Sequence, residues 1–96
     1  MTKEIRLERC YEVIHKLNGK RICSQMFHYL PNAEEYLSRH YEMELRYKRI
    51  FKNRTVSFDG TTLTTIKDNG VTNSIEIVPT IYDANDKERF TDKLVN

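Results

Sequence analysis

The segment from Ile22 to Tyr41 constrains the fold more than any other part of this sequence. Two short stretches with apolar residues at helical spacing flank the pair Pro31-Asn32. Ser24 stands where it can cap the first stretch, and Pro31 disfavours helical geometry in the residue before it. Asn32 stands where it can cap the second stretch, with Glu35 at the acid position of a capping box. The segment therefore predicts two helices separated by a tight turn.

The second of these helices is expected to continue through Leu45 toward Ile50, although residues 43–47 also alternate like a strand. The stretch from Lys3 to Leu17 fits two structures as well. Its apolar residues lie on one broad helical face, but several of them also alternate, and Asn18-Gly19 is a strong hairpin signal. We favour a helix over Lys3–Leu17 because Glu, Arg, Lys and Leu dominate the stretch.

The character of the sequence changes at Arg54. Three runs rich in Thr, Val, Ile and Phe follow, at 55–58, 61–66 and 74–78, with Asp59-Gly60 and Asp68-Asn69-Gly70 as turns between them. The tail from Asn85 to Val95 has Phe90 and Leu94 at helical spacing. The predicted fold class is α+β, with N-terminal helices in a helix-turn-helix-like arrangement, then a three-stranded antiparallel β-meander and a short C-terminal helix.

Length and composition limit the possibilities further. A chain of 96 residues suits one small domain, 1–96. Apolar runs are at most two residues long, so we expect no membrane span, no export signal and a cytoplasmic protein. Cys10 and Cys23 are expected to be free thiols. The spacing of Cys and His residues predicts no metal site, and no motif indicates a cofactor.

The charges are divided unevenly along the chain. Residues 1–54 hold twelve Lys or Arg against seven Asp or Glu, a net +5, whereas residues 55–96 hold four against seven, a net −3. A basic half suits an anionic partner. The densest basic cluster has Tyr47 and Phe51 interleaved and consists of Arg46, Lys48, Arg49, Lys52 and Arg54. Such a cluster can contact phosphates, or it can simply complement the dipole at a helix end.

The pairs Tyr29-Leu30 and Tyr36-Leu37, the Ser38-Arg39 that follows, and Tyr41 have a spacing that resembles the helix-turn-helix of arabinose-operon-type transcription activators. Residues 7–66 resemble a winged helix-turn-helix domain, with a wing around Asp59-Gly60. The resemblance implies duplex DNA as the partner and a role in transcriptional control. The third helix is the one expected to begin at Asn32. The resemblance implies that it contacts DNA through Ser38 and Arg39, with further contacts by the turn residues Lys20 and Arg21 and by the basic cluster.

A second hypothesis is a non-enzymatic protein-interaction module, such as a small inhibitor or adaptor that binds a larger protein. Glu34 and Glu35 favour it, because carboxylates at the start of the third helix would repel phosphates. Tyrosine is enriched at protein interfaces, and the residues that could form this surface are Tyr29, Tyr36, Tyr41 and Tyr47. Exposure of the third helix would favour DNA, and its burial would end that hypothesis.

An enzyme is not expected. The three histidines, His15, His28 and His40, have no nucleophile or carboxylate at a recognisable spacing. A histidine beside a cysteine can form a nucleophilic pair, but only proximity in space would reveal it. A small ribonuclease is a more distant possibility for a basic α+β chain of this size, and no motif identifies one.

Overall fold

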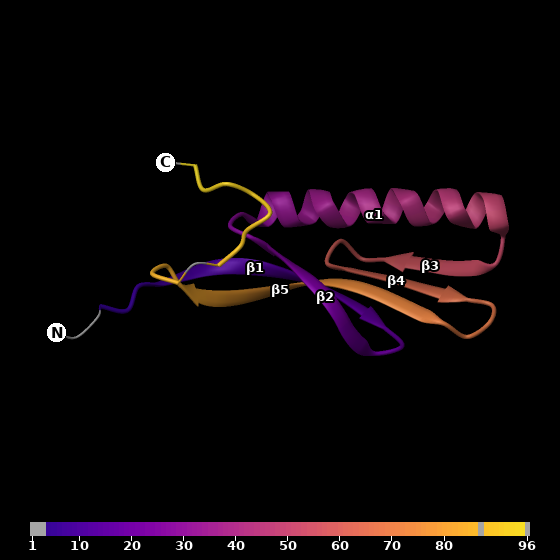
Figure 1. Cartoon of the computed structure of the whole chain (residues 1–96). Helices are drawn as coiled ribbons and strands as arrows, with labels where there is room; N and C mark the ends of the chain where they lie inside the picture. The colour runs from indigo at the N-terminus through magenta and orange to yellow at the C-terminus, as the bar shows by residue number, and fades with distance from the viewer. Residues whose placement is uncertain (1–3, 87, 96) are drawn as a thin grey trace.

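The computed structural model describes residues 4–86 and 88–95. Five strands form one antiparallel sheet in the order β2-β1-β5-β4-β3, and the single helix of the described residues lies along one face of the sheet (Figure 1). The elements are β1 (Leu7–Leu17), β2 (Lys20–Phe27), α1 (Leu30–Phe51), β3 (Arg54–Phe58), β4 (Thr62–Lys67) and β5 (Thr72–Asp83). The predicted fold class is therefore wrong, because the chain begins with a hairpin and not with helices.

The helix predicted over Lys3–Leu17 is wrong, although Lys3 itself lies outside the described residues. Leu7–Leu17 is β1, and it pairs with β2 across the turn at Asn18-Gly19. Both turn residues have positive φ, 50° and 82°, as a two-residue hairpin turn requires. The alternating pattern together with this turn outweighs the helix propensity of the charged residues between the apolar positions.

The first of the two helices predicted around Pro31 is also wrong, because Lys20–Phe27 forms the edge strand β2. Pro31 starts the helix instead of ending one. It lies in the first turn of α1, where N–H groups have no partner within the helix and the missing donor costs nothing. Tyr29 is the N-cap residue, so neither Ser24 nor Asn32 has the predicted capping role. The predicted continuation of the helix toward Ile50 is confirmed, since α1 runs without a break to Phe51.

The strands predicted after Arg54 lie close to the observed β3, β4 and β5. Gly60 and Gly70 have φ of 98° and 90° in the turns between them. The prediction was wrong about the length of β5 and about its second neighbour in the sheet. β5 is 12 residues long and pairs with the whole length of β1, from Leu7↔Asp83 to Leu17↔Asn73. This pairing joins the expected meander to the N-terminal hairpin in one sheet.

The C-terminal helix predicted over 85–95 is wrong for the described part of that range. The described residues after β5 form turns and irregular structure and run back toward the start of α1 (Figure 1). The Phe90 ring stacks on His28 with centroids 3.6 Å apart, and the Thr91 N–H donates to the Met26 carbonyl over 2.8 Å. These contacts hold the tail against β2, so the i, i+4 spacing of Phe90 and Leu94 does not reflect a helix.

The core lies between α1 and the sheet face that it covers. Val13, Phe27 and Ala33 are at most 3% exposed and pack together. Leu37 of α1 and Leu63 of β4 are also buried, which extends the core toward the meander. Partly buried residues complete this layer: Tyr11, Tyr36, Ile75 and Ile77. Because side chains alternate along a strand, the neighbouring positions of β1 and β5 face the other side of the sheet.

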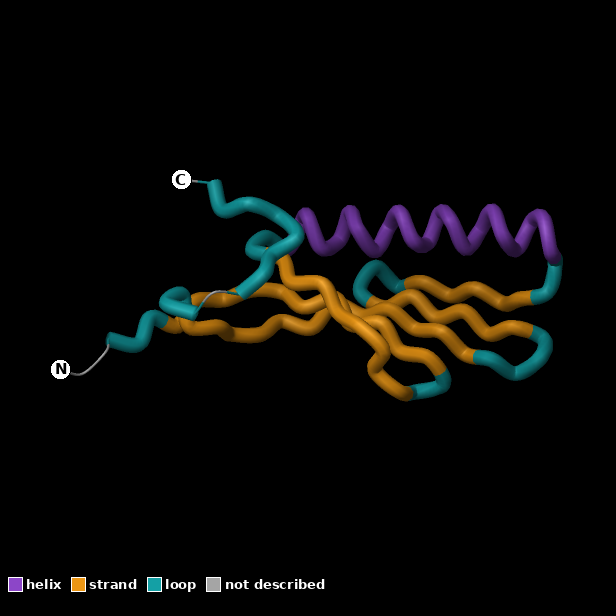
Figure 2. The backbone as a smooth tube through the Cα atoms, in the orientation of Figure 1, coloured by secondary structure: helices purple, strands orange, loops and turns teal. Residues whose placement is uncertain are grey.

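The molecule is elongated, with extents of 59 × 27 × 18 Å. β2 reaches only as far as Tyr11 of β1, and β4 pairs with β5 only up to Glu76. Residues 7–10 and 80–83 therefore continue beyond the other strands as a two-stranded ribbon, visible at the end of the sheet where the N-terminus lies (Figure 2). The C-terminal end of α1 lies at the opposite end of the molecule (Figure 1). Within the described residues, no helix is long and apolar enough to span a membrane.

Candidate functional site

The C-terminal part of α1 is the most exposed apolar and basic surface of the helix. Every residue from Leu45 to Lys52 is exposed, with Ile50 at 68% and Phe51 at 59%. Four cations lie among these residues, and the described residues form no ion pair with them. We call this surface the basic helix end, and it consists of Arg46, Lys48, Arg49, Ile50, Phe51 and Lys52. Cations in the last turn also complement the helix dipole, which is a structural reason for their presence.

Arg54 belonged to the predicted basic cluster, but the structure places it beneath the helix. Its side chain is 8% exposed and pairs with Glu44 over 3.0 Å. The guanidinium also lies 5.3 Å from the centre of the Tyr47 ring and 5.8 Å from that of Phe51. These contacts fasten the end of α1 to the start of β3, and they leave Arg54 inaccessible to phosphates.

The other predicted DNA contacts are not gathered on one surface. Arg39 is exposed on the first half of α1 and pairs with Glu35 over 2.7 Å, while Ser38 beside it is half-buried. Lys20 and Arg21 lie at the β1–β2 hairpin. Arg21 is held there by Glu12 and by the Ser24 hydroxyl. Among the predicted DNA-contact residues, Arg46, Lys48, Arg49 and Lys52 lie together on the basic helix end.

The four tyrosines proposed as a protein-binding surface each have a different neighbour. Tyr29 binds the backbone of Val95 through its hydroxyl, and Tyr41 packs against Phe58 with ring centroids 4.5 Å apart. Tyr36 faces the sheet, and Tyr47 covers Arg54. These rings help to attach α1 and the tail to the sheet. Tyr47, at 39% exposed, is the only one of the four that belongs to the exposed large hydrophobic residues.

A cluster of histidine and tyrosine lies between the first half of α1 and the β1–β2 hairpin, which the sequence did not indicate. His15 Nε2 is 2.9 Å from the Tyr36 hydroxyl, and the His15 and His40 rings meet edge to face at 5.4 Å. Cys23 is the cross-strand partner of His15, so the two side chains point to the same face. The signal available in the sequence was the alternation of Tyr11, Val13 and His15, which places His15 on the buried face.

Burial determines the protonation of this cluster. It lowers the pKa of the His15 imidazole, and His40 lowers it further. Burial also lowers the pKa of His40, against an opposing effect of the Glu44 carboxylate. Burial raises the pKa of Tyr36, with a further contribution from Cys23. At neutral pH the cluster therefore consists of neutral groups, which explains how two imidazoles can be in contact without repulsion.

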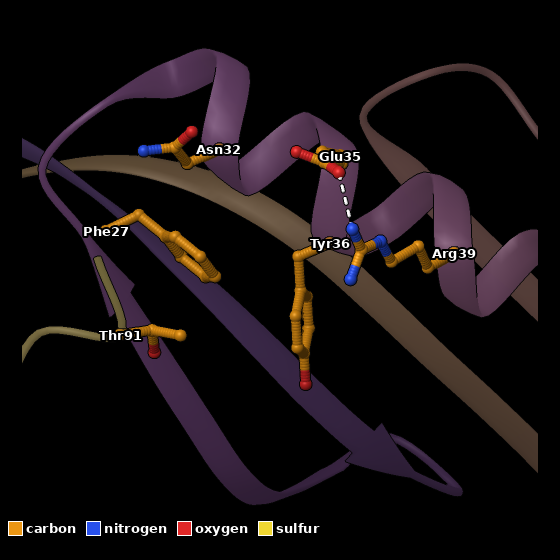
Figure 3. Close-up of a pocket in the computed structure, with 6 residues that line it drawn as sticks. All are labelled: Phe27, Asn32, Glu35, Tyr36, Arg39 and Thr91. Atoms are coloured by element: carbon orange, nitrogen blue, oxygen red, sulfur yellow. Dashed lines mark hydrogen bonds and ion pairs between the residues drawn. The ribbon is translucent and has the colours of Figure 1, made fainter.

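A small open pocket of about 210 Å³ adjoins the cluster (Figure 3). The rings of Phe27 and Tyr36 stand on two sides of it, and the paired Glu35 and Arg39 lie along the helix above. Ligand pockets usually measure about 300–1,000 Å³ and enclose most of the ligand. The pocket is smaller than that, and the Glu35 carboxylate already neutralises Arg39. We regard it as a feature of helix packing rather than as a substrate site.

The tail residue Asp92 was also missed by the sequence analysis. Its carboxylate accepts hydrogen bonds from the backbone N–H groups of His28 and Tyr29, over 2.7 and 3.2 Å, and from the Asn32 amide over 2.8 Å. Burial raises the pKa of the Asp92 carboxyl, but these hydrogen bonds outweigh burial and lower it. A carboxylate at the start of α1 also complements the helix dipole. Asp92 therefore fastens the tail to the residues that lead into α1.

The described residues include no group of three or more His, Cys, Asp or Glu side chains placed to hold a metal ion. Cys10 is buried and Cys23 exposed, and both are free thiols. Comparisons of the chain with models of protein families, with curated proteins and with solved structures found no match.

Proposed function

We propose that this chain is a non-enzymatic protein-interaction module that binds an acidic partner through the basic helix end. The observation that carries the proposal is the exposure of Ile50 and Phe51, at 68% and 59%, among four cations that form no ion pair within the described part of the chain. Exposed apolar residues that are grouped together and surrounded by polar ones mark interaction sites. Aromatic residues and Arg are enriched at the centres of such sites.

The partner follows from the chemistry of this surface. Ile50 and Phe51 require an apolar depression, and Arg46, Lys48, Arg49 and Lys52 require carboxylates or other anions around it. The Arg54–Glu44 pair holds the helix end in place without using any of these exposed groups. The surface is therefore positioned before the partner arrives, which lowers the conformational cost of binding.

Duplex DNA is the second candidate, and the same four cations favour it. Three features count against it. Glu34, Glu35 and Glu42 are exposed on the same helix and would repel phosphates. Arg39, the residue proposed to read bases, is paired with Glu35. The sheet also lies along one whole side of α1 and restricts its entry into a groove (Figure 1).

A photo-crosslinking amino acid at position 50 tests the proposal in the cells that make the protein. We expect one discrete protein adduct, and we expect Lys52→Glu to abolish it. The matched control places the same amino acid at Ile66, which is 48% exposed on the other face of the sheet. The proposal fails if no adduct forms at position 50, or if position 66 gives the same adduct.

DNA is tested with a random pool of duplexes at about 50 mM salt, where phosphate contacts are strong. The protein-interaction proposal predicts negligible binding. Binding that falls steeply toward about 200 mM salt, weakens with Lys48→Ala and does not depend on Ile50 would favour DNA instead.

A further inference from the structure

The two-stranded ribbon leaves one edge of β1 without a neighbouring strand. β2 ends at Phe27, opposite Tyr11, so β1 continues beyond it toward the N-terminus with its outer side open (Figure 2). On its inner side the same stretch of β1 pairs with β5. We call this open part of β1 the ribbon edge, and it consists of Leu7, Glu8, Arg9 and Cys10.

The backbone of the ribbon edge presents unpaired hydrogen-bonding groups. The Ala84 N–H donates to the Arg6 carbonyl over 2.7 Å, so the backbone of Arg6 faces β5. Successive residues of an antiparallel strand direct their backbone groups to opposite sides, so the N–H and C=O groups of Leu7 and Arg9 point outward. The described part of the chain supplies no hydrogen-bond partner for these groups.

Two other edges of the sheet are interrupted. The Ile77 N–H points to the outer edge of β5, where it donates to the Thr61 carbonyl over 2.9 Å, so Pro79 has the next outward position and supplies no N–H. The outer edge of β2 is partly occupied, because the Thr91 N–H donates to the Met26 carbonyl. The ribbon edge has neither a proline nor a bound segment of the described tail, so it can accept a further strand.

The side chains around the ribbon edge differ between its two faces. Leu7 is 67% exposed and Ile81 is 65% exposed. They share a face, because Ile81 lies directly opposite Arg9 and alternate residues of a strand point the same way. Arg6 and Glu8 line one pocket on the other face, and their side chains are 3.6 Å apart. The ribbon edge therefore has an apolar face and a face with a cation beside an anion.

We propose that two copies of this chain pair through their ribbon edges, in an antiparallel ladder centred on Leu7 that joins the two sheets. The same strand from two copies related by a two-fold axis forms an antiparallel, self-complementary pair. Outward backbone groups of one strand must meet those of the other. Leu7 of one copy therefore exchanges both hydrogen bonds with Leu7 of the second copy.

Charge selects this register. In the ladder centred on Leu7, Arg6 of each copy lies opposite Glu8 of the other, and opposite charges stabilise a cross-strand pair. A ladder centred on Arg6, Glu8 or Arg9 sets that residue opposite its own copy, and like charges directly opposite each other are destabilising. The selected register also brings Leu7 of both copies together on the apolar face, with Ile81 on the strand beside each of them.

The length of the ribbon edge fits the same register. Glu4 of one copy lies opposite Cys10 of the other, so the paired segments end just before Tyr11, where β2 begins to occupy the edge. The C-terminal end of α1 lies at the other end of the molecule from the ribbon (Figure 1). The dimer therefore carries its two basic helix ends outermost, and this inference does not depend on the proposed function.

We expect weak association into dimers. The ladder is short, whereas stable interfaces bury about 1,200–2,000 Å². Sedimentation velocity from micromolar to millimolar protein should show monomers and dimers without larger species, because a two-fold pair uses the ribbon edge of both copies. A chain that remains monomeric at the highest concentration, or one that grows beyond the dimer, overturns the inference.

Two single charge reversals test the cross-strand contacts. Arg6→Glu sets carboxylates opposite each other at both contacts of the dimer, and Glu8→Arg sets guanidinium groups opposite each other. Each variant alone should associate at least about tenfold more weakly than the natural chain. The control is Lys20→Glu at the exposed β1–β2 hairpin, which should leave association unchanged.

Mixing the two variants is the decisive step. One variant has carboxylates at both positions and the other has guanidinium groups at both, so a mixed dimer restores opposite charges at each contact. The mixture should form one-to-one dimers about as readily as the natural chain does, and this recovery also shows that both variants are folded. A mixture that stays monomeric, or a single variant that associates like the natural chain, overturns the inference.

NMR of a mixture of isotope-labelled and unlabelled natural protein tests the register directly. Arg6 and Glu8 of different copies form a non-hydrogen-bonded pair, in which the Cα atoms are only about 4.5 Å apart. We expect a contact between their α-protons across the two copies. Contacts between copies that involve only residues outside the ribbon would overturn the inference.

The basic helix end separates this inference from the proposed function. Lys52→Glu should abolish the crosslink from position 50 and leave the dimer unchanged, whereas Arg6→Glu should weaken the dimer and leave the crosslink unchanged. A dimer without any crosslink from position 50 supports the ribbon pairing and rejects the proposed function. Loss of the dimer in Lys52→Glu would show that the helix end forms the interface, and it overturns the inference.

Discussion

The two halves of α1 contrast in what holds them. The first half contributes Ala33 and Leu37 to the core, and Asp92 of the tail binds the backbone just before it. The second half has no buried residue, and it contacts the sheet through the Arg54–Glu44 pair and the packing of Tyr41 on Phe58. A single helix thus combines a structural half and an accessible half. The contrast indicates that stability and binding can be changed separately in this protein.

The largest effect on the free energy of unfolding should come from the first half of α1, which contributes to the core. Leu37 is 0% exposed, and Leu37→Ala should lower the free energy of unfolding by about 2–5 kcal/mol, through lost burial and the cavity left behind. Ile50→Ala, at a 68% exposed position, should change it by less than about 0.5 kcal/mol. Urea unfolding of dilute protein measures both. Similar losses for the two variants would show that the second half is not a separate surface.

The partly buried Arg54–Glu44 ion pair should have the next largest effect. Glu44→Gln leaves the Arg54 guanidinium in a site where its side chain is 8% exposed. Removal of one partner from such a pair should cost about 2–3 kcal/mol in urea unfolding. The matched control is Glu35→Gln, which breaks the exposed pair with Arg39 and should cost less than about 0.5 kcal/mol. Equal costs would mean that Arg54 finds another partner or reaches water.

Local signals in the sequence predicted the parts of the fold that depend on near neighbours. The Asp59-Gly60 turn is one case, because Asp59 accepts hydrogen bonds from the backbone N–H groups of Thr61 and Thr62. These bonds also lower the pKa of the Asp59 carboxyl. The length of α1 is another case, since helical spacing continues to Ile50. In both cases the residues that decide the structure are a few positions apart.

The failures involve distant partners. Whether Leu7–Leu17 is helix or strand depends on β5, which pairs with it from more than fifty positions away. Pro31 fits both the end and the start of a helix, and the strand partner of the preceding residues decides between them. Asp92 is 64 positions from the His28 N–H that it binds. No local pattern carries these pairings, so the partners of His15 and the attachment of the tail could not be predicted, even though strand alternation could place His15 on the buried face.

The attachment of the tail should have a smaller effect on stability. Asp92→Ala removes the carboxylate that binds the His28 and Tyr29 N–H groups just before α1, and should cost about 1–2 kcal/mol, because both donors lose their partner. Hydrogen exchange should speed up at 28–32 and leave the basic helix end unchanged. Asp86→Ala, an exposed position near the same tail, is the control. Faster exchange throughout α1 would show that its two halves unfold together.

The smallest effect should be a dependence of the free energy of unfolding on pH that comes from His15 of β1 and His40 of α1. Burial lowers the pKa of His15 and of His40 below their ordinary value of 6.5, so in acid the unfolded chain binds protons that the folded chain does not. Stability is therefore complete above about pH 6.5 and falls as the pH decreases below it. Glu44 opposes this for His40, and Tyr36 and Cys23 are the other titratable groups around the pair.

Asp92 does not contribute in this range. Its carboxyl pKa is lowered from the ordinary value of 3.8, so the stability that its carboxylate provides is lost only as the pH falls below about 3.8. Urea unfolding between pH 7.5 and pH 5 should therefore report the two imidazoles. His15→Gln with His40→Gln should flatten the dependence over that interval, whereas Lys48→Ala on the basic helix end should leave it unchanged. A dependence that persists in the double variant would show that groups other than His15 and His40 bind the responsible protons.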